Sequence, residues 1–295
     1  MHVVWFKRDL RVQDNRALSH AAARGDVLPL YVVESELWCE ADMSGRQWAF
    51  VAEALEGLKA DLQACGQPLL VRTGEMIDVL KALLQTTGIS ALWSHEETGN
   101  GWTFLRDKKV AAWCRANGIP WHELRNHGVQ RRLPSRDGWA ANWDRFMSGP
   151  LSPAPSLKPL AIDLGRIPSA SDLGLSPDTC PLRQTGGRRA GLERLNSFLS
   201  MRGSSYRSAM SSPVAGENAC SRLSPHLAWG TLSMREVAQA TWARQRAMKA
   251  NPAIATPNWR GSLKSFNGRL HWHCHFIQKL EDEPRIEFEN LHSKY

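Results

Sequence analysis

Apolar residues in the first part of the chain gather in short runs that alternate with amphipathic stretches. The runs at residues 2–6 and 27–34 are rich in β-branched and aromatic side chains, as expected of strands. The stretch that begins near Gly45 has near-helical spacing instead, with apolar residues at Phe50, Leu55, Leu58 and Leu62. This alternation predicts a parallel sheet covered by helices on both faces.

Cap and turn residues divide the same region into strands and intervening helices. Asp14 is expected to cap a first helix over residues 17–23 that stops at Gly25, and Gly66 is expected to end the helix that starts near Gly45. The remaining strands are expected at residues 68–72, 90–93 and 119–124, and further helices at residues 77–84 and 105–117. The predicted fold class is a doubly wound, Rossmann-like α/β sheet.

The composition changes after this region. Residues 148–181 are rich in Pro, Ser, Leu and Gly and show no period, which indicates a long connector. We therefore expect an α/β domain at residues 1–128, a connector at residues 129–185 and a helical domain at residues 186–295.

Strand signals are absent beyond the connector, so the second domain is expected to be all-α. Ser233 and Glu236 have the spacing of a capping box, and Ser224 followed by Pro225 is typical of a helix start. One apolar stripe at helical spacing comprises Leu192, Leu195, Phe198 and Leu199.

The chain is basic, with 37 Lys and Arg against 29 Asp and Glu and a formal net charge of +8. Such an excess favours polyanionic partners, because basic side chains release counterions from phosphates, but a solvated basic surface is an equal alternative. The same two interpretations, a DNA-phosphate face or a solvated helix face, apply to Arg188, Arg189, Arg194, Arg202 and Arg207.

Cysteine and hydropathy patterns bound the compartment. Six cysteines are scattered without the paired spacing of a zinc ribbon or a disulfide framework, so reduced thiols are expected. No apolar run reaches the length of a membrane span and no signal-peptide pattern is present, so we expect a cytoplasmic protein without membrane contact. His271, Cys274 and His275 lie within about one helical turn, but no further ligand completes a metal site, and packing is the favoured interpretation.

Residues 5–11 (WFKRDLR), followed by Asp14 and Asn15, form a charged loop at the end of the first strand. Ligands of open α/β sheets bind outside the carboxyl ends of strands, so this loop either meets a ligand or fixes the first crossover. The string resembles the opening signature of photolyases and cryptochromes. That resemblance implies an N-terminal domain that often holds an antenna chromophore, of unknown identity here because Trp102 and Thr103 do not match the family's usual folate-binding acidic residue.

Residues 220–227 (CSRLSPHL) combine hydroxyls, one guanidinium and a helix start, which suits a pyrophosphate. With Tyr206 before it, the segment resembles the FAD-diphosphate segment of the photolyase/cryptochrome family. The resemblance implies flavin-nucleotide contacts by Tyr206, Cys220, Ser221, Arg222, Leu223 and Ser224. It departs from the family pattern at Cys220, where a threonine is common, and at Met210, where an arginine is common.

Residues 265–276 (SFNGRLHWHCHF) resemble the family helix that passes beneath the flavin and faces the lesion. The resemblance implies that Phe266 and Arg269 lie at the cofactor and that Trp272, the candidate catalytic residue, stacks on the damaged bases. Arg269 stands where repair enzymes often carry a glutamate. Arginine favours a phosphate or the flavin over a pyrimidine, so this departure weakens the case for cyclobutane-dimer repair.

The resemblance implies a lyase of the deoxyribodipyrimidine photolyase type, in which reduced FAD, excited by blue light, passes an electron to a pyrimidine lesion in damaged DNA. A cryptochrome-type photoreceptor without repair is the alternative, and a bare nucleotide-binding or interaction module is a third. Family members generally continue for a further domain's length. We therefore expect the 295-residue chain to bind FAD weakly and to leave the stripe of Leu192, Leu195, Phe198 and Leu199 exposed.

Overall fold

The computed structural model describes residues 1–251, 257–292 and 294 and divides into two compact units. The first unit comprises Met1–Asn126, Ser152–Arg188 and Trp229–Thr231; the second comprises His127–Leu151, Arg189–Ala228 and Leu232–Tyr295. In the part of the chain that the structure describes, every helix is too short or too polar to cross a membrane.

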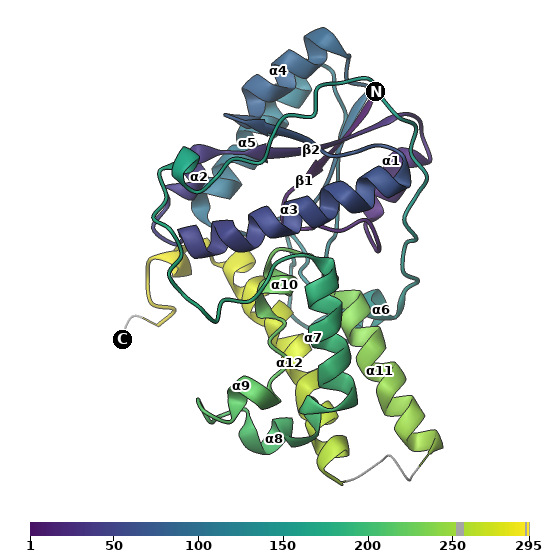
Figure 1. The fold of residues 1–295 in the computed structure, drawn as a ribbon, viewed down its shortest axis with the longest axis vertical. Helices are drawn as coiled ribbons and strands as arrows, with labels where there is room; N and C mark the ends of the chain where they lie inside the picture. Colours follow the sequence, from purple (N-terminus) through teal and green to yellow (C-terminus); the bar gives the residue numbers. More distant parts are fainter. Residues whose placement is uncertain (252–256, 293, 295) are drawn as a thin grey trace. The chain divides into compact units, whose positions relative to one another are not determined.

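The first unit, in which Figure 1 labels β1 and β2, is built on a five-stranded parallel sheet in the order β3-β2-β1-β4-β5. Its strands are β1 (His2–Phe6), β2 (Val27–Val33), β3 (Leu70–Thr73), β4 (Ala91–His95) and β5 (Trp121–Leu124). The chain moves outward from β1 to β3 and then crosses to β4 on the other side of β1. The strand order therefore reverses between β1 and β4, which confirms the predicted doubly wound sheet.

Alternate side chains of β1 enter the cores on the two faces of the sheet. Val4 and Phe6 pack in one cluster with the buried faces of α1 (Arg16–Ala22) and α3 (Gly45–Cys65). Val3 and Trp5 pack in the other with α4 (Met76–Thr86) and α5 (Gly101–Ala116). Since both faces are covered, every residue of β2 is buried, which explains its continuous apolar run.

The cap of α1 differs from the expectation. Asn15 is the N-cap, and its side chain accepts a hydrogen bond from the Leu18 amide at 2.9 Å. Asp14 instead has a left-handed backbone, with φ of 48°, and its amide donates to the Ser152 carbonyl at 2.7 Å. The Asp14 prediction was wrong because this residue fastens a distant segment of the chain.

Much of the expected connector folds with the α/β unit. The Leu157 side chain is buried in the core beside α3, and the Val71 amide of β3 donates to the Leu164 carbonyl at 2.8 Å. Residues 171–173 form a single 3₁₀ turn. The proline-rich segment thus covers the outer edge of β3, a strand edge that would otherwise be unpaired.

The regular secondary structure of the second unit is all helical in its described residues (Figure 1). Its helices are α6 (Trp139–Ser148), α7 (Arg188–Ser200), α8 (Tyr206–Ala209), α9 (Gly216–Ala219), α10 (Ser224–Ala228), α11 (Met234–Ala250) and α12 (Pro257–Asp282). The predicted capping box is confirmed, because Ser233 and Glu236 exchange side-chain to backbone hydrogen bonds of 2.9 Å at the start of α11.

The apolar stripe of α7 packs inside the second unit. Leu195 and Phe198 are buried in its core, and Leu192 and Leu199 are half-buried against the same cluster. The expectation of an exposed stripe was therefore wrong. Residues of α6, α11 and α12 supply the covering surface, and these residues are apolar: Trp143, Val237, Phe266 and Leu270.

Candidate functional site

Arg222 lies in the segment that leads into α10 and has an unusual backbone. Its φ is 59°, in the left-handed region that side chains other than glycine rarely adopt. Such strain costs of order 1–3 kcal/mol and is found mostly at functional sites. Among the described residues the Arg222 guanidinium has no hydrogen-bond or ion-pair partner, so it is available to an anion.

Arg202 fixes the backbone of the segment before Arg222 by hydrogen bonds. Its guanidinium donates to the carbonyls of Cys220 and Ser221, the latter at 3.4 Å. Its Nε donates to the Ser197 hydroxyl at 2.9 Å. These contacts tie the segment to α7, so the backbone before Arg222 is fixed at its approach to α10.

Positive charge is concentrated around this segment. Burial lowers the pKa of Arg202, and the nearby guanidinium groups of Arg194 and Arg222 lower it further. Within the described residues none of the three arginines makes an ion pair with a carboxylate. Since α10 has only five residues, its helix dipole is small, and these arginines are the main source of attraction for a diphosphate.

Tyr206 and Phe266 come together in an aromatic cluster with Phe198. The ring centroids of Phe198 and Phe266 are 4.6 Å apart, and the Tyr206 ring meets both others edge to face. Leu223 is buried in the same core. The cluster joins α7, α8 and α12 to the segment before α10, so the three segments that are expected to contact the flavin share one support.

Arg269 connects this cluster to the solvent face of α12. Burial raises the pKa of Tyr206, and the nearby Arg269 guanidinium opposes this increase. The same guanidinium lies over the Trp272 ring, 4.3 Å from its centroid. Trp272 is 52% exposed, and Phe276 one turn further along is 57% exposed. An exposed indole with a cation above it can receive another flat group only on its free side or by displacing Arg269.

The histidines of α12 have separate surroundings. His271 Nε2 lies 3.0 Å from Asp144 Oδ1, and its ring packs against Trp143 with centroids 3.8 Å apart. Burial lowers the pKa of His273 to about 4. Among the described residues no three side chains of metal-binding type gather into a common site.

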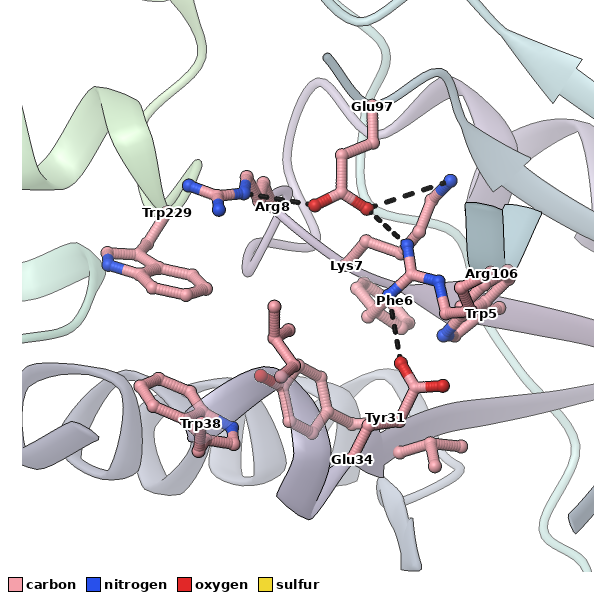
Figure 2. A pocket seen from close by; sticks show the side chains of 12 residues that line it. Trp5, Phe6, Lys7, Arg8, Tyr31, Glu34, Trp38, Glu97, Arg106 and Trp229 are labelled. Carbon is pink, nitrogen blue, oxygen red and sulfur yellow. Dashed lines mark hydrogen bonds and ion pairs between the residues drawn. The ribbon is translucent and has the colours of Figure 1, made fainter. Parts of the chain in front are cut away.

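A cluster of buried charges fills the crevice at the carboxyl ends of β2, β1 and β4 (Figure 2). Arg106 of α5 pairs with Glu34 at 2.9 Å and Glu97 at 2.6 Å, and also with its neighbour Asp107 at 2.9 Å. Lys7 pairs with Asp107 at 3.0 Å. The motif at residues 5–11 thus supplies cations to this crevice, but its carboxylate partners come from segments that sequence reasoning did not single out.

The carboxylates of this cluster differ in protonation. Burial opposes ionisation of Glu97, yet Arg106, Lys7 and Arg8 hold its pKa at about 2. Burial raises the pKa of Glu34 to about 7, because Arg106 offsets only part of the cost. Glu34 is therefore the carboxyl that carries a proton near neutral pH.

The crevice does not fit a planar chromophore. Its volume is about 20 Å³, which is room for about one water molecule. Trp38 of α2 (Ser35–Trp38) and Trp229 stack with centroids 5.7 Å apart at its mouth, and Arg8 lies 4.8 Å from the Trp229 centroid. Side chains of this chain occupy the space in which the fold would place a ligand.

Replacing Glu34 with glutamine should flatten the dependence of stability on pH. A carboxyl whose pKa is raised in the folded state stabilises the fold below its unfolded pKa, and this stability is lost as pH rises towards 7. Between pH 5 and 7 the unmodified chain should lose about 2 kcal/mol that Glu34→Gln retains. Urea unfolding at both pH values measures it, with exposed Glu36→Gln as the control; parallel profiles for Glu34→Gln and the unmodified chain would contradict the assignment.

Sequence comparisons match photolyases over the N-terminal part of the chain and over nearly its whole length. The DNA photolyase family model matches residues 2–131. A deoxyribodipyrimidine photo-lyase of Halobacterium salinarum is 27% identical over 99% of this chain and 63% of its own length. The chain therefore spans less than two thirds of that relative.

Solved structures support the fold of both units. A cryptochrome of Synechocystis superposes with a TM-score of 0.81 at 18% identity, covering 98% of this chain and 63% of its own. An archaeal photolyase of Sulfolobus tokodaii, described with two FAD molecules and a novel light-harvesting cofactor, superposes with a TM-score of 0.71 at 21% identity, covering 100% and 63%. The sequence match over residues 2–131 and the curated relative that aligns along nearly the whole chain make this chain similar to photolyases, and the solved structures show that it shares the fold of photolyases and cryptochromes.

Proposed function

We propose that this chain contributes to a blue-light-driven, FAD-dependent repair of pyrimidine lesions in DNA. The observation that carries the proposal is the cation cluster of Arg194, Arg202 and Arg222, which is without carboxylate partners among the described residues and borders a strained backbone. Bound FAD supplies, when reduced and excited by light, the electron that splits the lesion. This chain's residues hold and orient the flavin and the DNA.

The residues proposed to hold FAD have distinct tasks. Arg222, with the hydroxyls of Ser221 and Ser224, binds the diphosphate, while Cys220 and Leu223 keep the segment anchored in the core. Tyr206 and Phe266 form the buried aromatic core next to this segment, and Arg269 lies near Tyr206. Neutralisation of the diphosphate is the largest of these contributions, because no carboxylate among the described residues pairs with these arginines.

Damaged DNA is the proposed partner. The net charge of +8 favours a polyanion, and α12 presents Trp272 and Phe276 to solvent with Arg269 and Lys279 beside their rings. Exposed aromatic rings stack on unpaired bases, and adjacent cations bind phosphates. We also propose a cytoplasmic location, since all six cysteines are free thiols.

A cryptochrome-type photoreceptor is the second candidate, and Arg269 favours it. A carboxylate at this position would accept hydrogen bonds from a pyrimidine, whereas the Arg269 guanidinium already engages Tyr206 and Trp272. The two functions separate in one assay. Oligonucleotides bearing a pyrimidine dimer are incubated with the chain and FAD under reducing conditions, in blue light and in darkness. Light-dependent restoration of the pyrimidines supports repair, and photoreduction without restoration supports the photoreceptor.

Replacing Trp272 with alanine should weaken binding of the lesion-bearing oligonucleotide. Stacking of one base on an aromatic side chain contributes about 1–3 kcal/mol. Fluorescence anisotropy at fixed salt measures the loss, and Phe104→Ala, which removes a 60% exposed ring from α5, is the matched control. Equal affinities for the two variants would remove Trp272 from the proposed interface.

A further inference from the structure

The strand order predicts which crevice of the α/β unit would hold a ligand. Ligands of open α/β sheets bind outside the carboxyl ends of the strands, at the point where the strand order reverses. In this sheet the reversal lies between β1 and β4, and Lys7 and Glu97 follow these two strands. We infer that this crevice holds no light-harvesting chromophore, because the guanidinium of Arg106 occupies the ligand position.

The crevice is too small for a chromophore. Pockets for small ligands measure about 300–1,000 Å³. The crevice measures about 20 Å³, and its lining includes the buried Trp5 and Trp38 rings. The Arg106 guanidinium itself lies 4.6 Å from the Trp5 centroid, where a stacked ring system would lie. Entry of a flavin would require Arg106 to leave and the Trp38–Trp229 stack to open.

The ion pairs of the crevice also oppose the entry of a chromophore. Arg106 pairs with three carboxylates, and these carboxylates raise its pKa further despite burial. A ligand that displaced it would leave buried carboxylates without their main cation. Each cation of the cluster already pairs with a carboxylate of the chain, so none is left to bind a phosphate or carboxylate of a ligand: Lys7 pairs with Asp107, Arg8 with Glu97 and Arg106 with Glu34.

The ligand class that fits this position is therefore a guanidinium cation, and the chain provides its own. A second flavin like that described for the Sulfolobus tokodaii photolyase has no place in this crevice. The inference concerns the α/β unit alone and does not depend on the proposed function.

Amide hydrogen exchange of the full chain tests the inference. FMN and, separately, methenyltetrahydrofolate are added, and exchange is followed at residues 7–8 and 97–98. We expect no change at these amides, and saturable uptake that leaves them unchanged would agree with binding elsewhere. Protection of these amides at one equivalent of either compound would overturn the inference.

A variant tests the assigned guanidinium position directly. In Arg106→Ala, added methylguanidinium should slow exchange at the same amides and raise the melting temperature. It should do neither in the unmodified chain or in Arg115→Ala, which removes an exposed arginine from the same helix. If Arg106→Ala does not fold, Arg106→Gln replaces it. A folded variant that shows no response to methylguanidinium would contradict the assignment.

Discussion

Replacing Arg106 with alanine is expected to lower the free energy of unfolding by about 3–5 kcal/mol, because the change removes one partner of a buried ion cluster. The variant leaves the buried side chains of Glu34 and Glu97 without the guanidinium that lies within 3 Å of each. Urea unfolding at pH 7, followed by tryptophan fluorescence, measures the difference.

Two controls separate this effect from a general loss of helix stability. Arg115→Ala removes an exposed guanidinium from the end of α5 and should change stability by less than about 1 kcal/mol. Lowering the pH should reduce the deficit of Arg106→Ala, since protonation of Glu34 removes a buried charge that the lost guanidinium leaves without compensation. A deficit below about 1 kcal/mol at pH 7 would mean that solvent reaches the cluster.

Replacing Arg222 with alanine is expected to weaken FAD binding by about 1.5–3 kcal/mol, roughly 10- to 150-fold, through loss of a charge-assisted contact. The fold should be unaffected, since the Arg222 side chain has no partner among the described residues. Alanine keeps the left-handed strain at this position, whereas Arg222→Gly relieves it; similar losses of affinity in both variants would assign the effect to the guanidinium.

Arg246→Ala is the matched control for this change, because Arg246 is an exposed arginine of α11 in the same unit. Equilibrium dialysis against FAD measures all three variants. Retention of FAD by Arg222→Ala at the level of Arg246→Ala would remove this residue from the site.

The strands and helices of the α/β unit could be predicted because each has a hydrophobic pattern that depends only on neighbouring residues. A continuous apolar run such as β2 and helical spacing such as that of α3 depend only on neighbouring residues. The cap of α1 could not be predicted in the same way. Asp14 and Asn15 are both good capping residues, and the choice depends on Ser152, which is 138 residues away.

The flavin-binding role of residues 220–224 stays a prediction that rests on a local motif. The polar residues of this segment are contiguous, so a local motif was sufficient to find them. Arg202 was assigned to a basic helix face, because its role in holding the Cys220 and Ser221 carbonyls depends on a tertiary contact. The signal that could have found it is its place between the α7 stripe and Tyr206.

The charge cluster of the α/β unit was the least predictable feature. Lys7 and Arg8 belong to the charged motif at residues 5–11, which the sequence pattern already indicates. Glu34, Glu97 and Arg106 each follow or lie on a different element. Only the parallel sheet brings the ends of β1, β2 and β4 to one edge, where these side chains meet. A charged residue at the end of an apolar strand is the signal that such a cluster leaves in a sequence.

Titration of the purified chain with FAD at low and high salt tests most directly the claim that its arginine cluster binds the flavin diphosphate. The expected result is saturable binding of one FAD per chain that weakens with added salt, because half-exposed charges are screened, and that weakens further in Arg222→Ala. Absence of binding at low salt, or binding indifferent to both salt and Arg222, would contradict the account.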